Sequence, residues 1–274
     1  MNQIISKIYP QCKKSLYKAN NLYLKPILSK VNKTNKPYYF ANFLSSFDGR
    51  IATYDKNHSC LLTPERIKSK IDYSLFCQLH AQSDCLVTNT AYLKGLNKGY
   101  YGNILSIKNT ILKKWRDKNN LKTQDIIVLS NSLSFPINKS IELLRERITV
   151  LTTSRDDKKI QRLRKKGIKV IKCRGKNVSA KKLNQYIISK TYKAVYFIAG
   201  PTIVEQMICE NLLDKLYYST SICIMGSENY DELIRGKFLK KSRGLELIEM
   251  YIHTNKNSKI KQQTLFQVFN LREK

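Results

Sequence analysis

Short apolar runs alternate with amphipathic stretches along most of the chain. Runs of strand length occupy residues 38–44, 85–88, 126–129, 149–152, 169–171, 195–198 and 216–225. Helical patterns lie between them, at residues 67–79, 141–147, 156–166, 180–189 and 203–212. Strands separated by helices favour a largely parallel sheet that is covered on both faces. The pattern therefore predicts an α/β fold with a mostly parallel central sheet flanked by helices.

Helix and loop boundaries follow from particular residues. Thr63 is a suitable N-cap and Pro64 suits the first helical position, so a helix of about four turns is predicted after them. Gly167 is expected to end the helix at residues 156–166. Residues 89–103 hold three glycines and predict a loop. Residues 245–252 and 264–269 alternate as sheet-edge strands do, and an antiparallel return is compatible with them.

The chain divides into two parts by its patterning. Residues 1–36 are polar, basic and weakly patterned, and they predict a basic N-terminal arm with room for one short helix. No internal repeat or low-complexity linker divides the remainder. Residues 37–274 are therefore expected to form one domain.

Composition excludes several classes of protein. The chain is 42% hydrophobic and 26% charged, which is enough apolar material for a substantial core. No apolar run approaches twenty residues, and the start of the chain lacks the pattern of a secretory signal, so no membrane association is expected. The seven cysteines form no Cys-x-x-Cys pair, and the three histidines have no metal-ligand spacing. We expect a cytoplasmic protein with reduced thiols and no metal site.

The formal net charge of +30 is the most unusual property of the composition. A charge of this size is compatible with nucleic-acid binding. The lysines, however, are spread along the whole chain and do not form one patch. Attraction of small polyanions, such as dinucleotides and sugar phosphates, is therefore favoured over a nucleic-acid partner.

Candidate chemistry lies in three segments that follow predicted strands. Ligands of parallel sheets bind at the carboxyl ends of the strands. The first segment, residues 45–52, contains Asp48 and Arg50 around Gly49. The second segment, residues 88–92, offers hydroxyl and amide groups that could bind a ribose or a phosphate. On spacing alone, an ordinary tight turn and an ordinary polar loop are favoured for these two segments.

The third segment, residues 199–202, joins a predicted strand to a predicted helix. It reads AGPT, and small residues there expose backbone N–H groups at the start of the helix. Such N–H groups can bind an anion, for example the pyrophosphate of a dinucleotide. An ordinary helix entry explains the same residues equally well.

Together these segments resemble the RibD C-terminal family, the pyrimidine reductases of riboflavin biosynthesis. Residues 42–52, which read NFLSSFDGRIA, are similar to the opening strand and turn of that family. Residues 79–87, LHAQSDCLV, are similar to its LRAxADAxL segment, and residues 199–202 match its EGGPT turn in part. The likeness covers roughly residues 38–270. Residues 8–10, which read IYP, also resemble the stand-alone branch of the family, in which no deaminase domain precedes the reductase.

The resemblance implies a fold and a reaction. It implies a dihydrofolate-reductase-like reductase domain that transfers a hydride from NADPH to the ribose C1′ of a phosphorylated aminouracil, and a homodimer. The resemblance places the cofactor against Leu44, Thr88, Asn89, Tyr92, Ala199, Gly200, Pro201, Thr202 and Ile203. It places the substrate against Asp48, Ser59 and His80.

Some positions depart from the family pattern. Ile198 stands where the family has an acidic residue, and His80 stands where it has an arginine. Tyr92 and Leu96 replace polar residues of its cofactor loop. Two hypotheses follow: an active NADPH-dependent pyrimidine reductase, and a catalytically impaired member that binds a nucleotide or RNA through its basic surface.

Overall fold

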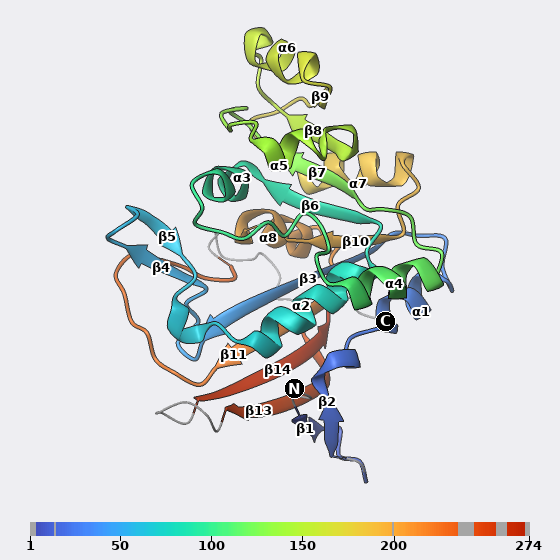
Figure 1. The fold of residues 1–274 in the computed structure, drawn as a ribbon, viewed down its shortest axis with the longest axis vertical. Coiled ribbons are helices and arrows are strands. Elements are labelled where there is room, and N and C mark those ends of the chain that lie inside the picture. Colours follow the sequence, from blue (N-terminus) through green and yellow to red (C-terminus); the bar gives the residue numbers. More distant parts are fainter. Residues whose placement is uncertain (1–3, 14, 199, 235–243, 256–261, 272–274) are drawn as a thin grey trace.

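A computed structural model describes residues 4–13, 15–198, 200–234, 244–255 and 262–271. Within these residues the main sheet has the strand order β2-β1-β13-β14-β11-β3-β10-β6-β7-β8-β9 (Figure 1). The strands from β11 to β9 run parallel: β11 (Lys215–Ser221), β3 (Tyr38–Ser46), β10 (Ala194–Phe197), β6 (Cys85–Asn89), β7 (Asp125–Leu129), β8 (Ile148–Thr152) and β9 (Lys169–Lys172). The predicted α/β fold with a mostly parallel central sheet is confirmed.

The other end of the sheet is antiparallel. It is formed by β14 (Gln262–Asn270), β13 (Glu246–Asn255), β1 (Ile4–Tyr9) and β2 (Leu16–Lys18). The last two strands of the chain have the antiparallel direction that their pattern allowed. Their predicted position at a sheet edge is wrong, because β1 and β2 extend the sheet beyond β13.

The structure also corrects the predicted basic arm at residues 1–36. This segment supplies β1, β2, the short 3-10 helix η1 (Ala19–Asn21) and the helix α1 (Pro26–Val31). Gln78 of α2 (Lys70–Gln82) accepts a hydrogen bond from the Tyr23 N–H at 2.9 Å, and Gln82 accepts one from the Ile27 N–H at 3.1 Å. Buried backbone groups need such partners, so these two glutamines attach the segment to the domain.

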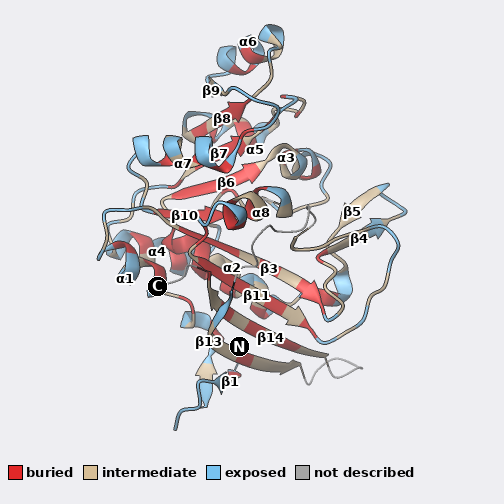
Figure 2. Ribbon diagram, turned by 180° about the vertical axis from the view of Figure 1, so that it is seen from behind, coloured by how far each residue is buried: buried red, intermediate tan, exposed pale blue. Residues whose placement is uncertain are grey.

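Helices cover both faces of the parallel strands and enclose two hydrophobic cores. The first core lies beneath α1, α2, α3 (Thr90–Asn97), α5 (Lys139–Glu142) and α6 (Asp157–Lys165), and the second beneath α7 (Ala180–Ser189) and α8 (Pro201–Cys209). Along β3, Phe40 enters the first core while Tyr39 and Ala41 enter the second. Burial on both faces, seen as the red strands of Figure 2, explains why these strands have nearly continuous apolar sequences.

Several predicted helices are confirmed in type and place. Asp156 caps α6, and Gly167 follows it with a φ of +77°. The helix α7 has the predicted limits. Residues 141–147 divide into α5 and the 3-10 helix η3 (Arg145–Arg147), and α4 (Thr110–Lys118), which no pattern predicted, packs against α2. β11 ends at Ser221, short of the predicted residue 225.

Two helix starts differ from the prediction. Ser69, rather than Thr63, caps α2, because its hydroxyl accepts hydrogen bonds from the N–H groups of Ile71 and Asp72 at 3.2 and 3.4 Å. Lys68 is extended, so the turn after Thr63 is a separate 3-10 helix, η2 (Glu65–Ile67). The loop predicted at residues 89–103 begins instead with α3, which is capped by the Asn89 side chain.

A second, smaller sheet lies beside the carboxyl ends of the central strands. It consists of β12 (Tyr230–Asp231), β4 (Ala52–Asp55) and β5 (Cys60–Leu62), in that order. Figure 1 shows β4 and β5 standing away from the main sheet on the side of α3. The sequence pattern did not predict this sheet, because its strands are short and none of their side chains is fully buried.

Candidate active site

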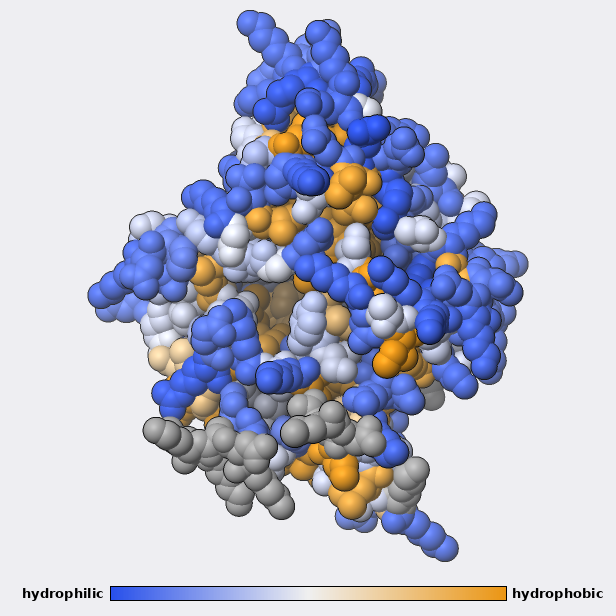
Figure 3. All heavy atoms as spheres, viewed as in Figure 1, coloured by the Kyte–Doolittle hydropathy of each residue, from blue (hydrophilic) through white to orange (hydrophobic). Residues whose placement is uncertain are grey.

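Three neighbouring parallel strands end at one edge of the main sheet. They are β3, β10 and β6, which lie side by side in that order. The three candidate segments follow these strands, so the structure brings them together as their order in a parallel sheet requires. A cleft lies beside these strand ends, visible as a hollow near the middle of the face in Figure 3, with apolar atoms within it and hydrophilic side chains around it.

The cleft has two adjoining chambers. The inner chamber, of about 820 Å³, is lined by Asn89, Tyr92, Gly200 and Pro201 together with residues of β3 and α3. The outer chamber, of about 1000 Å³, is lined by the first turns of α2 and by the hairpin of β4 and β5. The residues that line both chambers are Leu44, Thr63, Lys68, Tyr100 and Tyr101. Both volumes lie near the roughly 300–1,000 Å³ that is usual for small-molecule sites.

The start of α8 contributes backbone donors to the inner chamber. Gly200 is the N-cap of α8 and Pro201 is its first residue, and no side chain caps this end. A Cβ atom on Gly200 would stand 3.5 Å from Nδ2 of Asn89, so the two segments approach closely. The N–H groups of the first turn are therefore available to a ligand, as an anion site requires.

An aromatic loop forms another wall of the inner chamber. The Tyr92 hydroxyl donates to the Gly102 carbonyl and accepts from the Ile104 N–H, both at 2.9 Å. Burial raises the pKa of Tyr92 to about 12. The Tyr101 ring stacks on Tyr92 with centroids 6.0 Å apart and covers Gly95, where a Cβ atom would overlap the ring. Tyr92 therefore holds the loop in place, and its hydroxyl is occupied.

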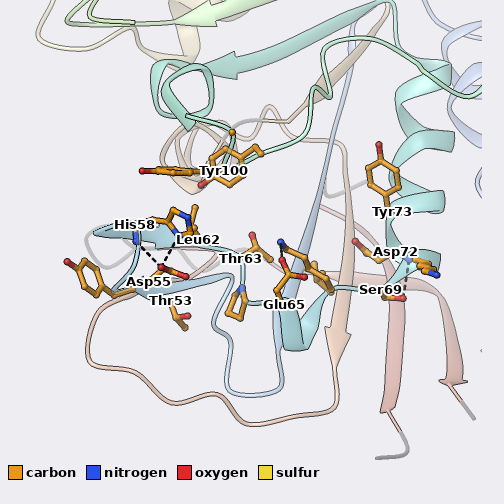
Figure 4. A pocket seen from close by; sticks show the side chains of 17 residues that line it. Thr53, Asp55, His58, Leu62, Thr63, Glu65, Ser69, Asp72, Tyr73 and Tyr100 are labelled. Atoms are coloured by element: carbon orange, nitrogen blue, oxygen red, sulfur yellow. Dashed lines mark hydrogen bonds and ion pairs between the residues drawn. The ribbon is translucent and has the colours of Figure 1, made fainter. Parts of the chain in front are cut away.

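The outer chamber has titratable side chains on opposite walls. On the hairpin, Nδ1 of His58 lies 2.9 Å from Oδ1 of Asp55, and the His58 ring meets Tyr100 edge-on with centroids 4.5 Å apart. On α2, Asp72 and Tyr73 line the facing wall, as Figure 4 shows. The chamber can therefore offer hydrogen-bond donors and acceptors to a ligand from two sides.

Asp72 has the most perturbed carboxyl group of the cleft. Burial raises the pKa of Asp72 to about 6, and a hydrogen bond with the Ser219 hydroxyl opposes this rise. The residue keeps part of its surface open to the outer chamber. A carboxyl group with such a pKa can change its protonation near physiological pH. Sequence reasoning missed Asp72, although an acidic residue at the third position of a helix that opens toward a cleft was an available signal.

Asp48, predicted as a substrate contact, holds the backbone together instead of lining either chamber. Its carboxylate accepts hydrogen bonds from the Ser46 hydroxyl at 2.5 Å, the Gly226 N–H at 2.8 Å and the Met225 N–H at 3.2 Å. Partial burial acts to raise its pKa, but these hydrogen bonds lower the pKa below the ordinary value. The adjacent guanidinium of Arg50 stacks on the Tyr230 ring at 3.4 Å. The contacts of Asp48 and Arg50 therefore link the turn after β3 to the connection between β11 and β12 and to β12 itself.

The other two predicted substrate residues also lie outside the lining. His80 is buried, and burial, together with the charges of Arg116 and Arg147, lowers its pKa to about 3. It is neutral, and its ring stacks near Phe76 at 6.1 Å between centroids. Ser59 is exposed at the tip of the hairpin with a φ of +52°, next to His58, which does line the outer chamber.

The predicted cofactor residues separate into lining and core positions. Leu44, Asn89, Tyr92, Gly200 and Pro201 line the inner chamber. Thr88 and Ile203 are buried, and Ile203 belongs to the second core. Thr202 is in the first turn of α8, and Ala199 lies outside the described residues.

In the residues that the structure describes, no group of three or more His, Cys, Asp or Glu side chains is arranged to hold a metal ion. Within that part of the chain, no helix has the length and apolar character needed to cross a membrane.

A family model described as the RibD C-terminal domain matches residues 37–258. This chain belongs to the RibD C-terminal domain family. The match covers the parallel strands, both walls of the cleft and all of β13, so it includes every described residue that lines the two chambers. The family is one of NAD(P)H-dependent pyrimidine reductases.

Individual relatives agree with the RibD family assignment. The chain is 24% identical over 218 residues to the 2,5-diamino-6-ribosylamino-4(3H)-pyrimidinone 5′-phosphate reductase of Archaeoglobus fulgidus, covering 78% of this chain and 93% of that protein. A pyrimidine reductase-like protein of Corynebacterium diphtheriae has a similar structure, with a TM-score of 0.73, 17% identity and coverage of 94% and 100%.

RibD of Acinetobacter baumannii gives a TM-score of 0.59 at 15% identity. That match covers 89% of this chain and only 60% of the bacterial protein, so the chain spans about three fifths of that relative's length. These structural matches show a shared fold.

This RibD family member has an apolar cleft at the positions that depart from the family pattern. Ile198 lines the inner chamber and packs against the first core, and Leu96 packs against the same core. Tyr92 has its hydroxyl bound within the loop, and His80 is neutral in the interior. The polar groups of the cleft come instead from residues that sequence reasoning missed: Asp55, His58, Lys68, Asp72, Lys94 and Lys98.

Proposed function

We propose that this chain is an NADPH-dependent oxidoreductase that reduces a phosphoribosylamino-pyrimidine in riboflavin biosynthesis. The substrate is of the 5-amino-6-(5-phosphoribosylamino)uracil type or its 2-amino counterpart. The observation that carries the proposal is the pair of adjoining chambers at the carboxyl ends of β3, β10 and β6. Hydride transfer needs two ligands held side by side, because the protein's main contribution is their alignment.

The inner chamber suits the cofactor. The N–H groups at the start of α8, after Gly200, would bind phosphate oxygens of NADPH. Lys94 and Lys98 line the same chamber from α3, and both are exposed, so they would add positive charge near the cofactor. Leu44 and Tyr92 would supply apolar contact. When bound, NADPH supplies the hydride.

The outer chamber suits the substrate. Leu44, Tyr100 and Tyr101 give it flat apolar surfaces where it meets the inner chamber, while Asp55, His58 and Asp72 offer polar groups. Of the residues first predicted to contact substrate, Ser59 lies beside His58 on the hairpin that forms this chamber. Asp48 and His80 would act on the substrate only through the backbone and helix that they support.

Cofactor binding is the direct test of this proposal. We expect NADPH fluorescence to change on titration of the full chain at micromolar cofactor, and we expect the NADPH to be oxidised when the phosphoribosylamino-pyrimidine is added. Replacing Lys94 and Lys98 by glutamine should weaken NADPH binding roughly 3- to 10-fold, because two phosphate-attracting charges are lost. The matched control replaces Lys158 and Lys165, which are exposed on α6. No binding at millimolar NADPH would contradict the proposal.

The net charge of +30 favours one alternative function. A family member that has lost the reaction could bind RNA through its basic surface. Retention on RNA would then be strong at low salt and would fall steeply as salt increases. Complementation of a strain that lacks the pyrimidine reductase separates the two functions, because only an active enzyme restores growth without riboflavin.

The proposal includes a cytoplasmic homodimer. All seven cysteines have free thiols, which is the usual state of cysteines in a reducing compartment. Sedimentation equilibrium of the purified chain tests the dimer. A mass equal to one chain of 31.9 kDa at micromolar concentration would contradict it.

A further inference from the structure

Asp72 differs from the other carboxyl groups of the outer chamber because it has no cationic partner. Asp55 is paired with His58, and Glu65 forms an ion pair with Lys68. Among the described residues, Asp72 forms no ion pair, and the opposing influence on its pKa is the Ser219 hydroxyl. Of the lysines and arginines that the structure describes, none forms an ion pair with this carboxyl group.

A carboxylate that has one hydroxyl donor, from Ser219, and no described cationic partner is unfavourable in such surroundings. Protein atoms crowd the Asp72 side chain, and burial raises its pKa to about 6. A buried charge normally has a partner of opposite charge or several hydrogen-bond donors. Because Asp72 lines the outer chamber from α2, the missing donors can come from a ligand in that chamber.

The geometry of a carboxylate restricts the ligand group that it binds best. Its two oxygens accept two parallel N–H bonds, which is why carboxylates bind guanidinium groups side-on. A 2-amino-4(3H)-pyrimidinone ring presents such a pair, the N3–H and the 2-amino group. Uracil has the N3–H between two carbonyl oxygens, so its O2 would repel one oxygen of the carboxylate. The two rings therefore differ in the edge that they offer to Asp72.

We propose that Asp72 binds the N3–H and 2-amino edge of the substrate ring and selects a 2-amino-4(3H)-pyrimidinone over a uracil. This inference rests on the proposed function, because it assigns the pyrimidine to the outer chamber. Asp72 is then the specificity-determining residue of the site. The ligand's two N–H groups donate to the two carboxylate oxygens, and the charge of Asp72 gains the donors that the free protein lacks.

Two bases that differ only at position 2 test the inference. They are 2,5,6-triamino-4(3H)-pyrimidinone and 5,6-diaminouracil, and each is titrated into the full chain, with and without NADPH, by calorimetry. We expect the triamino base to bind roughly 10- to 100-fold more tightly, the range of a charge-assisted pair of hydrogen bonds. Asp72→Asn should reduce this ratio to about threefold or less, because an amide offers only one acceptor.

The pH dependence gives a readout that a structural role of Asp72 would not produce. Protonation removes one acceptor, so the preference for the triamino base should fall about tenfold between pH 7.5 and pH 5 in the native chain. It should be constant in Asp72→Asn. Both bases carry the same 5-amino group, so its own titration cancels in the ratio.

Other titratable groups near the ligand must be distinguished from Asp72. Tyr23 and Tyr196 lie near Asp72 in the protein interior. Burial raises the pKa of both hydroxyl groups well above the ordinary value of 10. Tyr73, Lys68, Lys70, Glu65, Asp55 and His58 line the same chamber. His58 is the imidazole of this chamber, so His58→Gln is measured as a control and should keep the pH-dependent preference.

The outcomes separate this inference from the proposed function. Equal affinity for the two bases, or a preference for the uracil, overturns the inference even when NADPH binds and is oxidised. A preference for the triamino base that Asp72→Asn abolishes supports it even when NADPH does not bind. Asp72→Glu is a second variant that controls for a folding defect. It keeps a carboxyl group, so it should retain more of the preference than Asp72→Asn. The reverse order overturns the inference.

Discussion

The inner and outer chambers share five residues, yet they offer a ligand different chemistry. The inner chamber presents backbone N–H groups at the start of α8, aromatic rings and glycines. The outer chamber presents carboxyl, imidazole and hydroxyl groups from α2 and from the hairpin of β4 and β5. The N–H groups and glycines of the inner chamber are fixed by the fold of the backbone, while the polar groups of the outer chamber depend on individual side chains.

This difference has consequences for mutation. A site formed by backbone groups changes when the backbone moves. It should therefore respond to substitution of a residue that is closely packed against its neighbours, such as Gly95 beneath the Tyr101 ring. A side-chain-built site can lose its selectivity through one substitution while the fold is kept. Variants that disturb one chamber and spare the other therefore test whether the two are independent.

Loss of the Asp48 carboxylate should have the largest effect. Asp48→Ala removes the acceptor of three hydrogen bonds and leaves the N–H groups of Met225 and Gly226 without it. The free energy of unfolding should fall by roughly 2–4 kcal/mol, because hydrogen bonds to charged groups are the strong ones. Urea unfolding at pH 7 measures this change.

Asp48 holds the connection that leads into β12, and β12 pairs with β4 of the hairpin whose Asp55 and His58 line the outer chamber, so KM for the pyrimidine should rise more than Kd for NADPH. Asp48→Asn is the matched control, since it keeps an acceptor and should lose less stability. Equal weakening of both ligands would show that the chambers are not independent.

Gly95→Ala should affect the inner chamber. A methyl group at this position overlaps the Tyr101 ring, so the aromatic loop must shift. Overpacking of this kind costs roughly 1–3 kcal/mol. We expect a lower Tm and weaker NADPH binding, with a smaller loss of affinity for the pyrimidine base, because Tyr101 lines both chambers. Gly102→Ala in the same loop is the control, because a Cβ atom there meets nothing within 4 Å; similar losses in both variants would argue against the packing explanation.

Asp72→Asn should increase stability in a pH-dependent way. Burial raises the pKa of Asp72 to about 6 in the folded chain from the ordinary value of 3.8, so its ionisation costs folding free energy as pH rises from about 4 through about 6. The gain from the asparagine should therefore be absent below pH 4 and reach roughly 1–2 kcal/mol above pH 6, after allowance for its partial exposure. Unfolding midpoints from pH 3.5 to 8 measure it, and a gain that is constant with pH would rule out this origin.

The two alternative caps of α2 should give the smallest effects. Ser69→Ala should cost about 1 kcal/mol, the usual value of an N-cap hydroxyl, while Thr63→Ala should change stability by less than about 0.5 kcal/mol. Thermal unfolding of the two variants provides the comparison. A larger loss at Thr63 would favour the helix start predicted from the sequence.

The sequence predicted the parts of the fold that local patterns determine. The parallel strands are buried on both faces, so their apolar runs are easy to recognise, and α6 has both a capping aspartate and a glycine that ends it. The place of residues 4–31 depends instead on contacts with Gln78 and Gln82, more than fifty residues away. Contacts between residues so far apart in the sequence cannot be predicted from the local pattern of apolar and polar residues.

For the candidate site, too, the features that depend on local sequence were predicted and those that depend on distant contacts were not. The place of Gly200 and Pro201 at a helix start is confirmed, because a small residue and a proline there have a direct backbone consequence, while their contact with a cofactor stays a prediction. Asp48 was recognised but given a role in substrate contact, since its hydrogen bonds to Met225 and Gly226 come from a distant connection. Asp72 was missed because its chemistry arises from desolvation, which depends on what packs around it.

The pairing of β1 with β13 has a consequence for the making of this protein. Ser6 of β1 is paired with Ile252 of β13, so β1 must wait for a strand that is synthesised much later. Until then Ile5, which is 1% exposed in the finished fold, has no core to enter. Contacts so distant in sequence slow folding and leave intermediates open to aggregation. We therefore expect a nascent chain of this protein to bind chaperones until β13 and β14 have been synthesised.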